Sequence, residues 1–349
     1  MSELPLISVC IPAYNRAKLL PMLLQSILSQ SYLNYEIVIC EDMSPEREKI
    51  RQVALQYYES YPDIVKYHEN ENNLGYDGNL RRLIELAKGE YVLFMGNDDL
   101  LAEDALLTIA DALKKYPNIG VVLRSYDSFA KNEKEPIQIF RYFDDERFFN
   151  AGADTIVTFF RRCVFISGMV FKRDSALRCS TKRFDGTLLY QQHLAGHILA
   201  LENGVYIPQV LSHHRLGGVP DFGNSHSEKG RFVPHEQTPD SSIFFMSGML
   251  QIAFDLEKEL KLKVYGLILK DIGNYSYPIL SIQANQSRII FIKYIFNLGK
   301  LGLWRRPIFY VYVLGLLVLG KKICDSIIIK IKNKLGRAPV IGKVYSGNR

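Results

Sequence analysis

The chain has 349 residues, 48% hydrophobic and 23% charged, a composition that excludes wholesale disorder and predicts a folded protein of about two domains. The net charge of +6 is unevenly placed, because residues 289–349 hold eight Lys and four Arg against one acid, Asp325. That segment carries +11 and residues 1–288 carry −5, so we expect no nucleic-acid-binding face on the main body. A basic segment rich in apolar residues favours contact with an anionic membrane surface.

The cysteines are scattered, without the close spacing of zinc sites or disulfide frameworks: Cys10, Cys40, Cys163, Cys179 and Cys324. The amino-terminal residues contain no basic region followed by a long apolar stretch, so no signal peptide is expected. Both features predict a cytosolic, reducing location.

Short apolar runs alternate with segments of helical periodicity through the first third of the chain. We expect strands at 6–11, 36–40, 65–69, 91–95 and 120–123, and helices at 16–29, 46–61, 80–87 and 100–116. Nearly continuous apolar strands that alternate with helices indicate a parallel sheet covered on both faces. The sequence therefore predicts an α/β fold.

Polar or acidic residues follow three of these strands: Tyr14-Asn15, Glu41-Asp42 and Asn97-Asp98-Asp99. In an open α/β sheet the ligand lies outside the carboxyl ends of the strands, so we expect the three clusters to converge on one crevice.

The middle and end of the chain read differently. We expect a strand at 164–172, a helix at 188–201, an apolar run at 205–211, a long Gly- and Pro-containing loop at 215–239, and helices at 240–262 and 264–280. The apolar run 308–320 is shorter than the roughly 20 residues that cross a bilayer, and basic pairs flank it. It predicts an interfacial anchor; the alternative is a carboxyl-terminal core helix with a solvated basic end.

The adjacent carboxylates of Asp98 and Asp99 suit a divalent cation, Mn²⁺ or Mg²⁺, that is shared with substrate phosphates. The alternative is an acidic cap for the following helix. The chain has neither GxxxxGK[ST] nor GxGxxG, so a P-loop phosphotransferase and a standard dinucleotide fold lose their main signatures.

Four sequence blocks carry a resemblance to a known family: 7–15 (ISVCIPAYN), 36–44 (EIVICEDMS), 73–91 with its NLG and AKGEY segments, and 97–99 (NDD). In this order they resemble the family 2 glycosyltransferases, which have a GT-A fold. More narrowly, the chain resembles the abequosyltransferase-like branch, which attaches deoxy sugars in bacterial surface polysaccharides.

The resemblance implies roles for particular residues. It places Asp42 on the nucleotide base, Asp99 with Asp98 on the metal, and His214 or Arg215 on the diphosphate, with the following loop as a lid. The implied nucleotide-sugar site also includes residues from the first and third blocks: Pro12, Ala13, Tyr14, Asn15 and Asn79. Arg81 and Arg82 lie near a position where a basic residue of the family faces the phosphates.

The sequence departs from the family at the general base, the group that removes the proton of the acceptor hydroxyl. The acids expected about 90 residues after the metal motif are replaced by Gln191 and Gln192, and an amide is no base. Asp185 and His193 are the candidate substitutes; the alternative places Asp185 in a turn and His193 on a helix face.

The resemblance implies a non-processive transferase that moves a sugar from a nucleotide-diphosphate sugar to a lipid-linked glycan at the cytoplasmic face of the inner membrane. We expect a nucleotide-sugar-binding half at 1–125, an acceptor-binding half at 126–239, and a helical, membrane-associating extension at 240–349. The alternative is a non-catalytic nucleotide-sugar-binding protein, which the missing carboxylate favours. The one tryptophan, Trp304, is outside a Q-x-x-R-W motif, which argues against a processive synthase.

Overall fold

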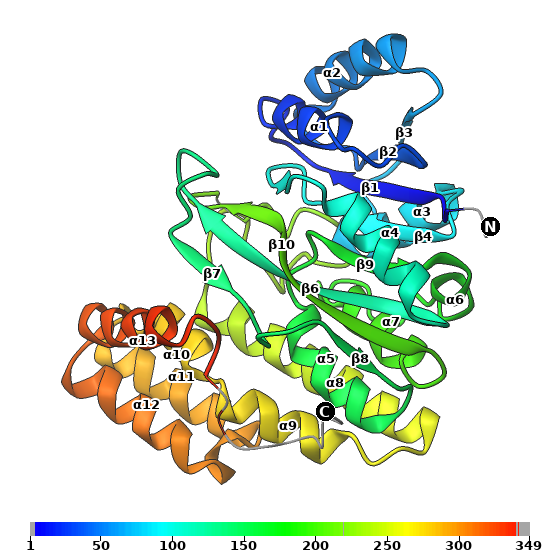
Figure 1. Ribbon diagram of the computed structural model, residues 1–349. Coiled ribbons are helices and arrows are strands. Elements are labelled where there is room, and N and C mark those ends of the chain that lie inside the picture. Colours follow the sequence, from blue (N-terminus) through cyan, green and yellow to red (C-terminus); the bar gives the residue numbers. More distant parts are fainter. Residues whose placement is uncertain (1–3, 219, 340, 342–349) are drawn as a thin grey trace.

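The computed structural model describes residues 4–218, 220–339 and 341. One mixed sheet runs through the molecule, with helices on both of its faces (Figure 1). Its strands are β1 (Ile7–Ala13), β2 (Tyr35–Glu41), β3 (Val65–Glu69), β4 (Tyr91–Phe94), β5 (Leu100–Leu101), β6 (Ile119–Phe129), β7 (Gln138–Phe140), β8 (Arg147–Phe149), β9 (Met169–Lys172) and β10 (Asn203–Arg215).

The main path of the sheet has the order β3-β2-β1-β4-β9-β6-β10-β5. Strands β3, β2, β1 and β4 are mutually parallel, while β9 is antiparallel to both β4 and β6. Strand β10 is parallel to β6 and pairs at its end with the short strand β5. This confirms the predicted α/β fold. Strand β6 crosses the boundary that we expected between residues 125 and 126, so both expected halves contribute strands to one sheet.

The helices of the first two thirds are α1 (Leu20–Leu28), α2 (Arg47–Ser60), α3 (Gly75–Leu86), α4 (Ala105–Lys115), α5 (Ala153–Phe160), α6 (Arg173–Arg178) and α7 (Tyr190–Ile198), with a 3-10 turn η1 (Arg161–Cys163). The carboxyl-terminal helices are α8 (Pro239–Leu260), α9 (Tyr265–Asn274), α10 (Tyr277–Gln283), α11 (Arg288–Lys300), α12 (Pro307–Val318) and α13 (Lys321–Leu335), with η2 (Leu303–Arg305).

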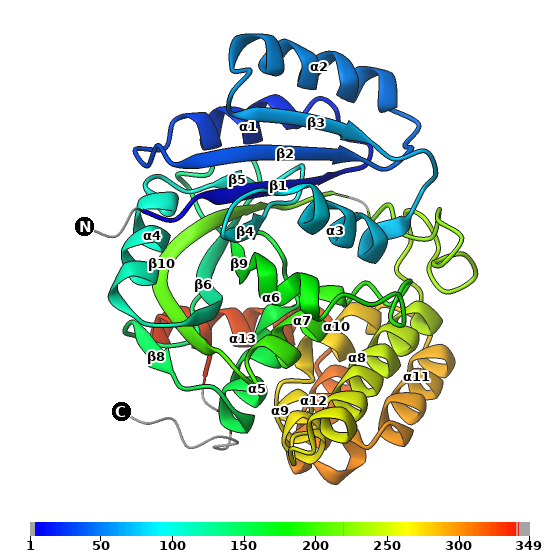
Figure 2. The ribbon, with the colours of Figure 1, turned by 90° about the vertical axis from the view of Figure 1, so that its right-hand side faces the viewer.

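Alternation along the buried strands divides the core into two layers. Val9 and Ile11 of β1 face a cluster that includes residues of α1, α2 and α4, whereas Cys10 faces the opposite cluster. The second cluster continues from α3 and α7 into α8, α9, α11 and α12. The carboxyl-terminal helices therefore share a core with the sheet, at the opposite end of the molecule from α1 and α2 (Figures 1 and 2).

Several expected elements differ in their bounds, among them three that position the sheet. The helix expected from residue 100 begins at Ala105, since Leu100 and Leu101 pair with β10. The strand expected at 164–172 is limited to β9. Strand β10 runs through Pro208, where a register shift against β6 accommodates the missing N–H.

In the part of the chain that the structure describes, no helix is both long and apolar enough to cross a membrane.

Candidate functional site

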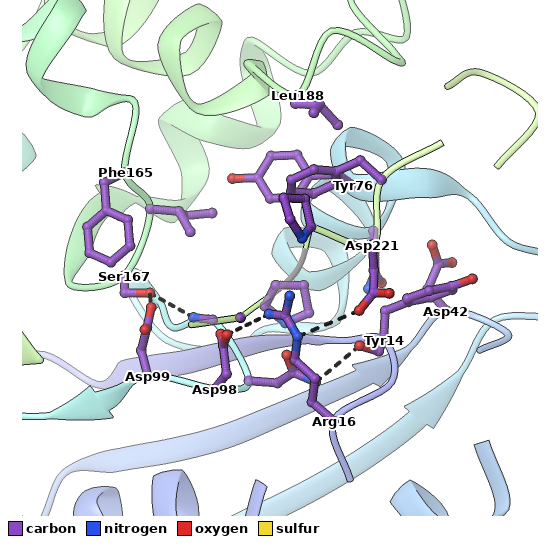
Figure 3. Close-up of a pocket in the computed structure, with 18 of the residues that line it drawn as sticks. Tyr14, Arg16, Asp42, Tyr76, Asp98, Asp99, Phe165, Ser167, Leu188 and Asp221 are labelled. Atoms are coloured by element: carbon purple, nitrogen blue, oxygen red, sulfur yellow. Dashed lines mark hydrogen bonds and ion pairs between the residues drawn. The ribbon is translucent and has the colours of Figure 1, made fainter. Parts of the chain in front are cut away.

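A cavity of about 520 Å³ lies at the carboxyl ends of the parallel strands (Figure 3). Its wall contains residues from all three polar clusters, among them Tyr14 after β1, Asp42 after β2 and Asp98 after β4. The end of β10 and the segments 216–218 and 220–224 complete it. The expected convergence of the strand-end clusters is therefore present.

Asp42 joins strand β2 to helix α3. Its carboxylate accepts hydrogen bonds from the backbone N–H groups of Leu74 and Gly75, at 2.8 and 2.9 Å, and from Asn70 Nδ2 at 2.8 Å. Burial outweighs these bonds and raises the pKa of Asp42 from 3.8 to about 6. The helix start that these contacts fix also carries Asn79, which lines the same cavity.

Asp98 and Asp99 have different environments although they are adjacent. Asp99 is 3% exposed; Ser167 Oγ donates to one of its oxygens, and His214 Nδ1 and the Arg215 N–H lie 3.0 Å from the other. Asp98 instead meets the Arg16 guanidinium, with 2.6 Å between Nη1 and Oδ2 (Figure 3). Burial and the neighbouring Asp99 raise the pKa of Asp98. Asp98 is thus the carboxylate that a cation in the cavity would relieve, and Asp99 organises the end of β10.

Arg16 is a cavity residue that the sequence did not single out. It lies directly after β1, where Asn15 and Arg16 have φ values of 53° and 60°, in the left-handed region that costs energy for residues other than glycine. This turn aims the side chain so that Nη1 reaches Asp98 and Nε lies 3.6 Å from Asp221 Oδ2. The sequence could have indicated Arg16, because it directly follows the block 7–15 that resembles the family.

The end of β10 places two basic groups at the cavity. Burial by itself lowers the pKa of His214, but its hydrogen bond to Asp99 and the charges of both aspartates outweigh that effect and leave the pKa raised. Arg215 Nε donates to the Asp98 carbonyl at 3.2 Å. Both residues line the cavity, as the sequence predicted, although they belong to a strand and not to a loop.

The segment after β10 passes beside α3 (Figure 2), and several of its residues line the cavity. Glu228 holds it there, since its carboxylate accepts from the N–H groups of Tyr76 at 2.7 Å and of Gly223 at 2.9 Å. Phe222 packs edge to face on Tyr76, with 5.6 Å between ring centroids. These anchors are far apart in sequence, so no local pattern predicted them.

Two other expected residues, Ala13 and Asn15, are not part of the cavity wall. The Ala13 carbonyl accepts from the Asp42 N–H at 3.0 Å, and the Asn15 carbonyl accepts from Asn97 Nδ2 at 2.8 Å. They hold the three strand-end clusters together through the backbone.

The two base candidates do not reach the cavity. Asp185 is held by Arg81 in a two-pronged ion pair, with Nη1–Oδ1 and Nη2–Oδ2 distances of 2.7 and 2.8 Å. His193 is buried on α7 with Nε2 on the Cys179 carbonyl, and burial lowers its pKa to about 4, which makes it a weak base. Neither residue thus lies beside the cavity in this structure. The Arg81 guanidinium is engaged by Asp185, and Arg82 pairs with Glu85 at the surface.

The side chains of Gln191 and Gln192 form structural hydrogen bonds to the backbone. Gln191 Nε2 donates to the Val164 carbonyl and Gln192 Nε2 to the Phe160 carbonyl, at 2.9 and 2.8 Å. These two amides therefore tie α7 to the end of α5 and to the segment that follows it.

The residues fit a divalent cation only as part of a shared site. In the described ranges, no group of three or more His, Cys, Asp or Glu side chains is arranged to hold a metal. The Asp98–Asp99 pair supplies protein carboxylates at the cavity, and substrate phosphates would have to supply the remaining ligands.

Residues 8–174 match the sequence model of glycosyl transferase family 2. The match covers just under half of the chain. The chain is 32% identical over 182 residues to the abequosyltransferase RfbV of Salmonella typhimurium. The aligned region covers 52% of this chain and 54% of that protein. It is 34% identical over 107 residues to the GalNAc(5)-diNAcBac-PP-undecaprenol beta-1,3-glucosyltransferase of Campylobacter jejuni, 30% of this chain and 34% of that one. The match thus spans about half the length of the abequosyltransferase.

A solved structure has a similar fold. The crystal structure of S. aureus TarS 1-349 in complex with UDP-GlcNAc matches with a TM-score of 0.59 and 16% identity, over 96% of this chain and 93% of that one. At that identity the likeness shows the GT-A type fold.

Proposed function

We propose that the protein is a non-processive glycosyltransferase that moves a sugar from a nucleotide-diphosphate sugar to a glycan acceptor of bacterial surface polysaccharide synthesis. The observation that carries the proposal is the cavity at the strand ends, where Asp42, Asp98 and Arg16 converge within a family 2 domain. Its volume of about 520 Å³ lies within the roughly 300–1,000 Å³ typical of sites for small molecules.

Different residues of the cavity would bind different parts of the nucleotide-sugar donor. Asp42 accepts hydrogen bonds from N–H groups, which suits the edge of a nucleobase, and Tyr14 lines the wall beside it. Arg16, His214 and Arg215 supply positive charge, or hydrogen bonds to anions, for the diphosphate. A divalent cation held with Asp98 would neutralise charge on the departing diphosphate, in line with the polar groups that surround it.

The acceptor in this proposal is lipid-linked, and the carboxyl-terminal helices support that part. Val311, Leu314 and Val318 form one stripe of α12 and are 61%, 63% and 71% exposed. Arg305, Arg306, Lys321 and Lys322 flank that helix. An exposed apolar stripe between basic groups suits peripheral association with the anionic cytoplasmic leaflet.

A flotation experiment tests the membrane part. The full chain should float with phosphatidylglycerol vesicles and far less with phosphatidylcholine vesicles, and the double variant Leu314→Asp, Val318→Asp should stay in the soluble fraction. Leu33→Asp is the matched control, since Leu33 is 84% exposed on the amino-terminal half. If the double variant floats like the unaltered chain, α12 does not contact the membrane.

The transferase itself is tested by incubating the full chain with UDP-, GDP-, CDP- and dTDP-sugars, Mn²⁺ and a polyprenyl-diphosphate glycan. Release of nucleoside diphosphate with extension of the glycan supports the proposal. Donor binding without either transfer or slow hydrolysis would instead support the second candidate, a non-catalytic nucleotide-sugar-binding protein. That candidate is favoured by one observation, the use of Gln191 and Gln192 as buried structural amides.

A further inference from the structure

A second cavity, of about 430 Å³, adjoins the first one. It lies between the segment 232–237 and helices α8, α9 and α10. Five residues belong to the walls of both cavities, which therefore lie side by side: Val164, Leu188, Pro220, Phe222 and Phe245. A molecule bound across these shared residues would reach from the first cavity into the second.

The buried part of the second cavity is apolar in effect, because the polar side chains of Ser241, Ser242, Ser276 and Arg161 are already engaged. Ser241 donates to the Thr238 carbonyl at 2.9 Å, Ser242 accepts from Gln283 at 3.0 Å, and Ser276 donates to the Gly273 carbonyl at 2.9 Å. Arg161 is paired with Asp271, at 2.8 Å between Nε and Oδ2. Sugar hydroxyls entering here would lose hydrogen bonds to water without replacement, at a cost that hydrocarbon does not incur.

The remaining wall consists of side chains that adapt to hydrocarbon. Met246 and Met249 of α8 are each 4% exposed and line it, and methionine fills irregular apolar space well. Ile279 and Ile282 of α10 also line it. Ile282 is 40% exposed, so this wall reaches the protein surface.

More exposed isoleucines follow this rim in the chain. Helix α10 leads directly to α11, whose first turn exposes Ile289 (82%) and Ile290 (45%). Exposed isoleucine side chains therefore occur both at the rim of the second cavity and at the start of the next helix.

We propose that the second cavity binds the hydrocarbon chain of the acceptor lipid next to its phosphate head, an isoprenoid-type chain that enters past Ile282. The inference rests on the proposed function for its orientation, since the head group would then face the donor cavity. Arg161 is the one basic residue among the described residues of this wall, and its ion pair with Asp271 leaves no free positive charge there, which agrees with a neutral hydrocarbon occupant; Glu236, also in the wall, is exposed to solvent.

Calorimetric titration of the full chain with farnesyl phosphate and with farnesol tests the inference. Both should bind, and inorganic phosphate should not compete. Ile279→Asn should weaken binding by about tenfold, because a polar amide replaces apolar contact. Ile282→Asn should do the same, and it is the variant less able to disturb folding, since Ile282 is 40% exposed. Leu107→Asn is the matched control: Leu107 is also a 40% exposed helical residue, on α4, and its variant should bind normally.

Three results would overturn the inference: no binding of either probe, wild-type binding by Ile282→Asn, or a loss caused by Val318→Asn, which would place the probe on the exposed face of α12. Donor binding is measured on the same variants. If farnesol binds as predicted while no nucleotide-sugar binds, the transferase proposal fails and the hydrocarbon site stands. If sugar transfer occurs without farnesol binding, only the hydrocarbon site is wrong.

Discussion

The Arg16 guanidinium lies 2.6 Å from the Asp98 carboxylate, and the second arm of the same side chain faces Asp221, which also lines the cavity. The Arg16 side chain thus connects the turn after β1 to Asp98, which follows β4, and to Asp221 on the segment after β10. A positive group already stands where a diphosphate and its cation would be expected to bind.

Asp98→Asn should remove Mn²⁺-dependent donor binding while the protein stays folded, because a neutral amide binds a hard cation poorly. Electron paramagnetic resonance of Mn²⁺ with a nucleoside diphosphate measures this directly. Asp99→Asn serves as the comparison. Since Asp99 is enclosed by Ser167, His214 and the Arg215 N–H, its variant should chiefly lower thermal stability. Wild-type Mn²⁺ binding by Asp98→Asn would return the metal role to Asp99.

Arg16→Gln should weaken the binding of nucleoside diphosphate by roughly 10–100-fold and leave binding of the free nucleoside unchanged, since a charge-assisted hydrogen bond is lost. Titration calorimetry with UDP or CDP against uridine or cytidine separates the two effects. Arg51→Gln is the control, because Arg51 pairs with Glu48 and Glu69 away from the cavity. An equal loss for nucleoside and diphosphate would assign Arg16 a purely structural role.

Donor affinity should fall as the pH drops below about 6, where Asp42 takes up a proton and no longer presents a carboxylate to the base. Between pH 3.8 and about 6 the native state keeps a proton that the unfolded chain has lost. The contribution of this group to the free energy of unfolding is therefore full below pH 3.8 and declines as pH rises through about 6. Asp42→Asn should abolish the low-pH fall in affinity; its persistence in that variant would assign it to another group.

Asp77→Ala should lower the free energy of unfolding by about 3–5 kcal/mol. The buried Asp77 carboxylate accepts from the N–H groups of Gly186, Leu188 and Tyr190, each at 2.9 Å, and the alanine variant leaves all three without that acceptor. Urea unfolding measures the change. The control is Asp174→Ala, whose side chain is 75% exposed and which should alter stability by less than about 0.5 kcal/mol. Equal stability of the two variants would contradict the stabilising role of Asp77 in segment 186–190.

Deletion of the residues after 286 should destabilise the whole protein, because Phe291, Tyr294 and Leu298 are buried in the core cluster that reaches the sheet. Thermal unfolding of the shortened chain should begin at lower temperature and end in aggregation. A shortened chain with unchanged unfolding and solubility would show that these helices are independent of the sheet.

The sequence predicted what is local and periodic. The apolar runs gave β1, β2, β3 and β4 within a residue or two, and the polar residues after them do meet at one cavity. What it missed depends on long-range contact. Leu100 is a strand residue because His213 pairs with it, and Asp185 is unavailable as a base because Arg81 holds it. The turn that aims Arg16 uses two left-handed residues; asparagine adopts this conformation more readily than most residues, but no residue preference predicts it for Arg16.

The most direct test of the account is equilibrium binding of UDP-, GDP-, CDP- and dTDP-sugars to the full chain, with and without Mn²⁺, compared with Asp42→Ala and Asp98→Asn. The account predicts that one base class binds, that Mn²⁺ strengthens the binding, that Asp98→Asn abolishes this Mn²⁺ effect, and that Asp42→Ala weakens binding with and without the metal. Binding of no nucleotide-sugar by the full chain, or binding that both variants retain unchanged, would contradict it.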